Sequence, residues 1–261
     1  MTTLAHPPSH PSRLAALLVS AATSVLLCSS PRAATAQRWE LASADGLRLH
    51  NVSAEPATLA GKRAVRITIS SEAKAVYERL QATPAPPPGG ATAAAAAFLE
   101  LLALVPDSEL GDGTIEIDLA GEVRPGAPPG ARGFIGVAFR VKPDLRTYDA
   151  FYLRPTNGRA EDQERRNHTT QYVSHPDWPW YRLRQETPGR YESYVDIQPG
   201  TWIHLKIEVA GEKARLYVDG GEQPTLVVND VKSGPGASGQ VALWIEGSTI
   251  AHFANLVVTK K

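Results

Sequence analysis

Residues 148–194 hold the densest collection of side chains in this sequence that could do chemistry. Arg, His, Trp, Tyr, Asn and Gln are interspersed through this segment, and its middle is too polar for a plain core strand. Flat rings stack on the apolar face of a pyranose, and amides and guanidinium groups hydrogen-bond to its hydroxyls. The segment therefore predicts a saccharide-binding surface. The candidate contacts are Tyr152, Arg154, Asn157, Arg159, Arg165, Arg166, His168, Gln171, Tyr172, His175, Trp178, Trp180 and Arg184.

The charged run at residues 159–168 has three interpretations. It could carry a catalytic acid and base, with Glu161, Asp162 or Glu164 acting with His168. It could bind an anionic sugar, because a guanidinium pairs with a carboxylate or sulfate in two-point geometry; the arginines for this are Arg154, Arg159, Arg165 and Arg166. It could also be a salt-bridged surface loop, since residues 144–190 hold seven acids and eight bases, a net of +1.

The ring-rich run that follows is stiffened by Pro176 and Pro179. Rigid rings on such a loop can stack on a sugar. The alternative is that Trp178 and Trp180 fold back and plug one end of the domain.

A metal site has little support in the sequence. His168 and His175 are seven residues apart, which is not a zinc spacing. Asp162, Asn167 and Asp177 could supply oxygen ligands to calcium, but no Asp-rich loop motif accompanies them. We expect no cofactor, with calcium as the one ion left open.

Strands must position these side chains. Period-2 alternation of apolar residues predicts strands at 38–42, 62–70, 113–121, 133–141, 148–155 and 201–209, among about a dozen. Successive side chains of a strand point to opposite sides, so Tyr148, Tyr152 and Arg154 share one face. An Asp-Gly turn ends the strand at 213–218, and 72–80 indicates one short helix. With turns every 8–12 residues, the pattern predicts an all-β, two-sheet antiparallel jelly-roll sandwich.

The N-terminus indicates export. Residues 1–36 are typical of a secretory signal peptide, with Arg13 before an apolar run at 14–27 and an Ala-x-Ala cleavage site ending at Ala36. We therefore expect a secreted or periplasmic protein, of bacterial type from its Ala/Pro/Arg-rich leader. Cys28 leaves a lipoprotein anchor as an alternative. Residues 37–261 then form one domain with a Pro/Gly/Ala-rich insertion at about 82–97.

Composition narrows the range of partners. Removal of the leader leaves 25 basic and 27 acidic residues, a net charge of −2, and no cysteine. Near-neutrality argues against nucleic acid and against an anionic membrane surface. No later apolar run is long enough to span a bilayer. The expected partner is a carbohydrate.

The C-terminal part resembles a known superfamily. The run TWIHLKIEVAGEKARLYVDGG, followed by GQVALWIEG and FANLVV, is similar to concanavalin A-like lectin/glucanase domains, both laminin-G-like and 3-keto-disaccharide hydrolase-like. The resemblance covers about 112–259 and consists of core and turn residues. It implies the jelly-roll fold, and it leaves lectins, adhesion modules and glycoside hydrolases open.

Glucanases of this superfamily carry E-x-D-x-E or E-x-D-x-x-E on one strand, and Glu116, Asp118 and Glu122 come close to that pattern. Retaining hydrolysis needs carboxyl groups about 5–5.5 Å apart. Glu116 and Glu122 are roughly 20 Å apart on an extended strand, unless the chain bends at Gly121.

Three functional hypotheses follow. The leading one is an exported jelly roll that binds a glycan through the 148–194 face. The second is a glycoside hydrolase of the same fold, cleaving a 3-keto-glycoside or a polysaccharide, with its acid at Glu116, Asp118 or 161–164. The third is an adhesion module that binds another protein.

Overall fold

The computed structural model describes residues 1–4, 35–82 and 99–261. The predicted leader at 1–36 and its Cys28 lie almost entirely outside the described residues, as does the predicted insertion at 82–97, so these stay predictions. Within the described part of the chain, no helix is long and apolar enough to cross a membrane.

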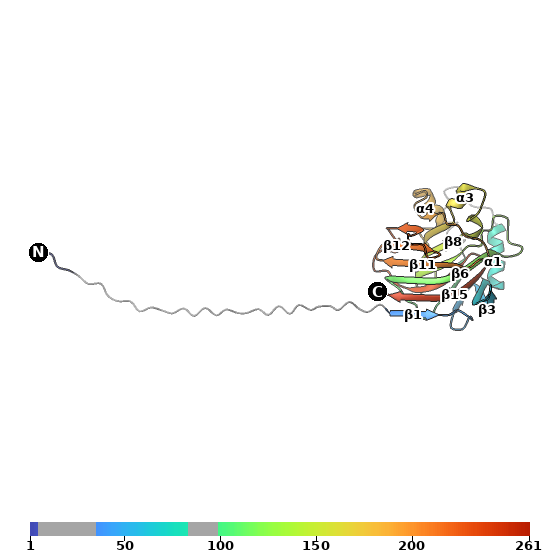
Figure 1. The fold of residues 1–261 in the computed structure, drawn as a ribbon, viewed down its shortest axis with the longest axis horizontal. Coiled ribbons are helices and arrows are strands. Elements are labelled where there is room, and N and C mark those ends of the chain that lie inside the picture. Colours follow the sequence, from blue (N-terminus) through green and yellow to red (C-terminus); the bar gives the residue numbers. More distant parts are fainter. Residues whose placement is uncertain (5–34, 83–98) are drawn as a thin grey trace. The chain divides into compact units, whose positions relative to one another are not determined.

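Two antiparallel sheets make up the fold (Figure 1). Sheet A has the order β13-β12-β11-β6-β15-β4-β3, with β1 paired to β15. Its strands are β1 (Thr35–Trp39), β3 (Val52–Leu59), β4 (Lys62–Ile69), β6 (Gly113–Val123), β11 (Ile203–Ala210), β12 (Lys213–Val218), β13 (Leu226–Val228) and β15 (Thr249–Lys260).

Sheet B has the order β10-β9-β8-β7-β14-β5-β2. Its strands are β2 (Arg48–His50), β5 (Leu102–Leu104), β7 (Ile135–Val141), β8 (Tyr148–Leu153), β9 (Thr170–His175), β10 (Glu192–Ser193) and β14 (Gln240–Ile245). The predicted all-β, two-sheet antiparallel sandwich is confirmed.

The core lies between the inner faces of the sheets. In sheet A, β6 and β11 bury every second residue, as their alternation predicted. In sheet B, Phe139, Phe151 and Tyr172 form a row of contacting rings. Gly121 of β6 faces Ile135 of β7, and a Cβ on Gly121 would approach the Ile135 side chain to 2.7 Å. This position therefore excludes a side chain because the two sheets approach each other there.

Strand β15 divides one of its edges between two partners. Its first half pairs with β4 and its second half with β1, while β6 runs along the other edge. The register shifts between Ala254 and Val257, and Asn255 has a φ of +55°. This bulge lets one long strand join both ends of sheet A.

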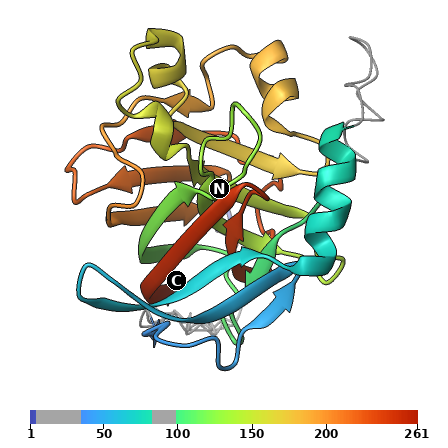
Figure 2. The same ribbon diagram turned by 90° about the vertical axis from the view of Figure 1, so that its right-hand side faces the viewer.

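Among the described residues, four helical elements flank the sheets: α1 (Ser71–Ala82), η1 (Pro155–Asn157), α3 (Gln163–Asn167) and α4 (Trp180–Glu186). Helix α1 runs beside the sheets, and α3 and α4 lie together at the opposite end of the view from β1 (Figures 1 and 2). Helix α3 begins where the Asp162 carboxylate accepts from the Arg165 amide at 3.1 Å, an N-cap.

The central segment differs from its prediction in one respect. Residues Thr170–His175 form a fully buried strand, β9, between β8 and β10. The expectation that the polar middle of the segment could not be a core strand was therefore wrong. Its polar side chains are buried because they hydrogen-bond within the sheet, as Gln171 does to the carbonyls of Tyr172 (2.8 Å) and Tyr191 (3.2 Å).

Candidate functional site

The outer face of sheet B carries an aromatic pair that spans three strands. Tyr152 of β8 and Trp244 of β14 both lie opposite Gly136 of β7. Because Gly136 has no side chain, the two rings lean over it and stack with centroids 4.8 Å apart. The Phe134 ring lies 5.8 Å from the Tyr152 ring. The result is a continuous apolar row, with Trp244 and Phe134 only half-buried.

A half-buried acid, Glu100, adjoins this row. The Tyr148 hydroxyl donates a very short hydrogen bond to the Glu100 carboxylate and accepts from Trp244 Nε1 at 3.2 Å. Burial raises the pKa of Glu100 to about 7, although the Tyr148 hydrogen bond opposes the shift. The ring of His175 packs against Tyr148 at 5.0 Å, and burial lowers its pKa to about 4. At neutral pH the acid is partly protonated and the imidazole is uncharged.

The other end of the row meets a charged centre around Glu192. Its side chain is 3% exposed and contacts three positively charged or titratable groups. Arg154 Nη1 lies 3.4 Å from Glu192 Oε1, Arg184 Nε donates to Oε2 at 3.0 Å, and His168 Nδ1 lies 3.0 Å from Oε2. The Glu192 carboxylate is therefore buried next to positive charge, whereas burial of an isolated carboxylate would cost too much free energy.

Arg154 links this centre to the aromatic row. Its Nη2 donates to the Tyr152 hydroxyl at 3.2 Å and to Gln171 Oε1 at 3.1 Å. The guanidinium also lies over the rings of Phe134 and Tyr152, at 5.4 and 5.1 Å. Its Nη1 donates to the His168 carbonyl at 2.7 Å. One side chain therefore fixes the aromatic row, β9 and the Glu192 centre relative to one another.

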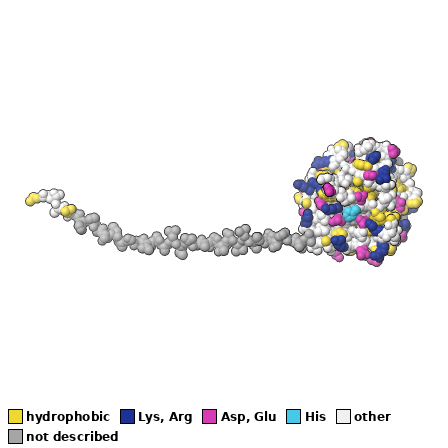
Figure 3. Space-filling view, in the orientation of Figure 1, with side chains coloured by type: hydrophobic (Ala, Val, Ile, Leu, Met, Phe, Trp, Pro, Cys, Tyr) yellow, Lys and Arg dark blue, Asp and Glu magenta, His cyan; other side chains and the backbone are white. Residues whose placement is uncertain are grey.

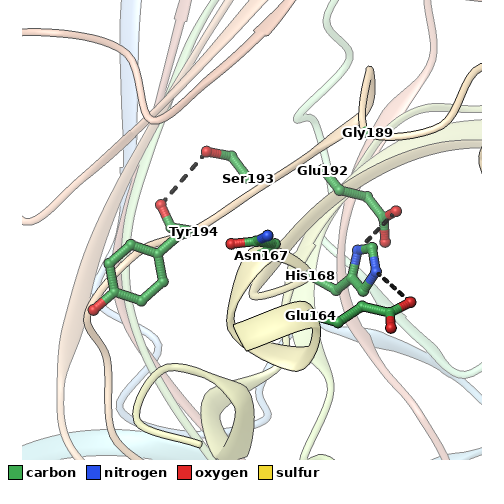
Figure 4. A pocket seen from close by; sticks show the side chains of 7 residues that line it. All are labelled: Glu164, Asn167, His168, Gly189, Glu192, Ser193 and Tyr194. Carbon is green, nitrogen blue, oxygen red and sulfur yellow. Dashed lines mark hydrogen bonds and ion pairs between the residues drawn. The ribbon is translucent and has the colours of Figure 1, made fainter. Parts of the chain in front are cut away.

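A pocket of about 420 Å³ opens over the Glu192 centre. Figure 4 shows His168 between the carboxyl groups of Glu192 and Glu164, with Tyr194 on the other side of Asn167. Burial lowers the pKa of His168; Glu192 opposes the shift, and Arg184 and Arg154 add to it. The Tyr194 ring is 39% exposed. The lining residues are Glu164, Asn167, His168, Gly189, Glu192, Ser193 and Tyr194.

The structure brings together six of the residues that the sequence singled out. They share the outer face of sheet B or the adjacent pocket: Tyr152, Arg154, His168, Gln171, His175 and Arg184. Tyr172 points the other way, into the core, where its hydroxyl donates to Asp149 at 2.6 Å. Asn157 is buried and donates to the His168 carbonyl at 3.2 Å, which supports the loop that carries His168.

Three further predicted contacts, Arg159, Arg166 and Trp180, are not among the residues that line the pocket. Arg159 is exposed and pairs with Asp196 at 2.7 Å, and Arg166 donates to the Tyr194 hydroxyl at 2.7 Å. Trp180 is 37% exposed, and the Arg184 guanidinium lies 4.8 Å from its ring.

Trp178 has a different environment from Trp180. It is half-buried, and the Arg182 guanidinium (3.8 Å) and the Lys232 ammonium (4.6 Å) both lie over its ring. Of the two indoles at this end of the molecule, Trp180 is therefore the more open to a ligand.

The acids proposed for catalysis fall in two separate places. Glu161, Asp162 and Glu164 are exposed around α3, and only Glu164 lines the pocket, 3.9 Å from His168 Nε2. Glu116 and Asp118 lie on the outer face of β6 in sheet A, where acidic and basic side chains intermix over the surface (Figure 3).

Asp118 is held by three donors. Lys62 (2.6 Å), His204 (2.8 Å) and Asn255 (2.8 Å) all hydrogen-bond to its carboxylate. Burial acts to raise the pKa of Asp118, but the three hydrogen bonds together lower it. A carboxylate held ionised in this way is a poor proton donor.

Two of the residues considered for calcium have hydrogen-bond partners of their own for their side chains in the structure. Asp162 caps α3, and Asn167 Oδ1 accepts from Gln163 Nε2 at 2.8 Å. Across residues 35–82 and 99–261, no three or more His, Cys, Asp and Glu side chains are grouped so that they could hold a metal ion.

Sequence reasoning missed three residues that build the site: Glu100, Glu192 and Trp244. Glu192 lies near the end of the 148–194 segment but was not singled out there. Glu100 and Trp244 belong to segments that show ordinary strand patterns. The one sequence signal for Glu192 was its position as an acidic residue close to several arginines, which could have indicated an ion pair. Nothing local marks Glu100 or Trp244, because each acquires its partners through strand pairing.

Comparisons with known proteins address the fold. No protein-family model matches the chain, and no curated protein matches it. Three solved structures illustrate the likeness. Carbohydrate-binding module CBM66 from Bacillus subtilis is 14% identical, over 81% of this chain and 97% of that one, with a TM-score of 0.45.

The second is a galectin-like protein of unknown function from Bacillus subtilis, 14% identical over 85% and 94% of the two chains, with a TM-score of 0.44. The third is the Bacillus licheniformis beta-glucanase, 12% identical over 89% and 100%, with a TM-score of 0.43. The likeness of these three structures to this chain is one of fold.

Proposed function

We propose that the protein binds a glycan on the outer face of sheet B, in the pocket over Glu192 and along the aromatic row. The observation that carries this proposal is that Arg154 contacts both parts of the site. It hydrogen-bonds to Tyr152 of the aromatic row, and it pairs with Glu192 of the charged centre. A sugar needs both surfaces, since its C–H face packs on rings and its hydroxyls bond to fixed polar groups.

The exposed rings support this assignment. Trp180 and Tyr194 are the exposed aromatic residues of the described chain, and both lie around the Glu192 centre. An apolar ring left in water at a polar pocket is the arrangement that a saccharide covers. Both rings are also held by arginines, Arg184 and Arg166, so they are ordered before a ligand arrives.

A glycan array that also detects released products tests the proposal. We expect retention of a glycan by the native protein and a loss of about tenfold in affinity in Tyr194→Ala, because one stacked ring is worth roughly 1–2 kcal/mol. Trp178→Phe is the matched control, since Trp178 is covered by Arg182 and Lys232. Equal losses in the two variants would remove the pocket from the proposal, and retention of no glycan would end it.

Glycoside hydrolysis is the second candidate, and one observation favours it. Glu100 is partly protonated near neutral pH and lies on the same face as the aromatic row. A carboxylic acid with a raised pKa is what protonation of a glycosidic oxygen requires. In the same array, release of shortened products by the native protein but not by Glu100→Gln would select this function over binding alone.

A further inference from the structure

Two arginines at the edge of the site lack an acidic partner. Arg132 and Arg165 lie on either side of the Thr156 backbone: the Thr156 amide donates to the Arg132 carbonyl at 3.4 Å, and Arg165 Nη2 lies 3.5 Å from the Thr156 carbonyl. The Arg132 guanidinium contacts the Ala131 carbonyl at 3.2 Å. Within the described residues, neither guanidinium forms an ion pair. Both side chains are half-buried.

Three of the other arginines near the site have an acidic partner, while Arg166 donates to the Tyr194 hydroxyl. Arg154 and Arg184 pair with Glu192, and Arg159 pairs with Asp196. Arg132 and Arg165 therefore differ from Arg154, Arg184 and Arg159. Burial lowers the pKa of Arg132, and the positive charges of Arg165 and Arg154 lower it further. Like charges that are partly removed from water raise the free energy of the unliganded protein, and a bound anion would relieve this.

Unpartnered polar atoms collect at the same place. Thr156 Oγ1, Asn157 Oδ1 and Arg165 Nε are buried and have no hydrogen-bond partner. Buried polar groups in folded proteins are otherwise almost always paired, so a local group of exceptions points to a missing ligand or water. Of these atoms, the guanidinium nitrogen of Arg165 and the hydroxyl of Thr156 can donate hydrogen bonds to an oxyanion, while the Asn157 amide oxygen can only accept.

We propose that Arg132 and Arg165 bind the anionic group, carboxylate or sulfate, of an acidic saccharide. The proposal rests on the proposed function and gives its ligand a chemical class. Phe134 is two residues after Arg132, and its half-buried ring begins the aromatic row. A sugar ring against Phe134 would thus bring its charged substituent to the arginines, while a guanidinium fork holds two oxygens at once.

Four glycans in matched pairs test this by titration calorimetry. Oligogalacturonate is compared with the same oligomer after its carboxyl groups are reduced to alcohols, and a sulfated galactan with its unsulfated parent. We expect at least one acidic member to bind about tenfold or more tightly than its neutral partner, because charge-assisted hydrogen bonds are about twice as strong as neutral ones. The two pairs separate carboxylate from sulfate recognition.

Variants then locate the effect. Arg132→Gln and Arg165→Gln are each expected to remove the preference for the acidic glycan and to keep binding of the neutral one. Arg159→Gln is the matched control, since that exposed arginine already pairs with Asp196 and should leave the preference unchanged. The Tm of unliganded Arg132→Gln should not fall, because the substitution relieves repulsion; a purely structural arginine would lower it.

The outcomes are distinct. Equal affinity for acidic and neutral glycans in the native protein, or the same loss in Arg159→Gln as in Arg132→Gln, overturns the arginine assignment and leaves glycan binding standing. Failure of the native protein to bind any glycan, in this titration and on the array, overturns both.

Discussion

Sheet A and sheet B each carry ionisable side chains on the face that points away from the shared core. On sheet A the face includes well-exposed pairs: Lys206 and Glu208 pair at 2.7 Å with 39% and 38% of their side chains exposed. On sheet B the pair between Arg154 and Glu192 is 6% and 3% exposed. The residue types are similar, but their surroundings differ.

This difference in the exposure of the ion pairs indicates which face could hold a functional site. Exposed pairs contribute little because water and salt screen them. Charges removed from water must be paired with opposite charges, so removal of one buried partner strongly lowers the stability of the fold. A half-buried cation without an acidic partner, such as Arg132, therefore indicates a candidate binding site. The sheet B face also shifts the pKa of Glu100 and His175 far from their usual values, and these are changes that a functional site uses.

The largest expected effect is at the Glu192 centre. Arg154→Ala should lower the free energy of unfolding by about 3–5 kcal/mol, because it leaves a buried carboxylate with one partner fewer. Urea denaturation measures this. Arg159→Ala, which breaks the exposed pair with Asp196, serves as the control and should cost about 1 kcal/mol or less. Equal, small losses in both would show that the buried pair between Arg154 and Glu192 contributes no more than an exposed pair.

The raised pKa of Glu100 makes the stability of the protein depend on pH, which tests the description of the sheet B face. Its folded-state pKa is raised from the usual 4.5 to about 7, so the folded protein holds a proton that the unfolded chain has lost over this range. Stability should therefore fall as pH rises from about 4.5 to 7 and stay lowered above that. The loss is up to about 3 kcal/mol at 1.36 kcal/mol per unit of pKa.

Glu100→Gln should remove this fall, so that the variant is the more stable protein at pH 8. Thermal melting of both proteins at pH 5, 6, 7 and 8 measures it. Parallel melting curves across the range would mean that the Glu100 carboxyl is as well solvated as those of sheet A.

The smallest effect belongs to sheet A. A double-mutant cycle on Lys206 and Glu208 should give a coupling free energy of about 0.2–1 kcal/mol, because both side chains are well exposed. Chemical denaturation in low and high salt measures it, and salt should reduce it. A coupling free energy above 2 kcal/mol that salt leaves unchanged would place this face on a par with sheet B.

Much of the scaffold could be predicted from local pattern. Strands β6, β11 and β4 were expected within two residues of their observed bounds, since every second side chain is apolar and an extended chain buries alternate positions. The same alternation placed Tyr148, Tyr152 and Arg154 together on one face. Strand β9 escaped prediction because Gln171, Ser174 and His175 are buried through hydrogen bonds and ring packing, which hydrophobic periodicity does not register.

The sequence by itself determined the two-sheet all-β class and the segment, 148–194, that carries most of the candidate site. Only the tertiary structure decided which side chains meet. Glu100 before β5, Trp244 on β14 and Glu192 on β10 come to one face because the sheet orders its strands β10-β9-β8-β7-β14-β5. That order is set by hydrophobic contacts and pairings between residues distant in the chain, so no local pattern around these three residues could indicate it.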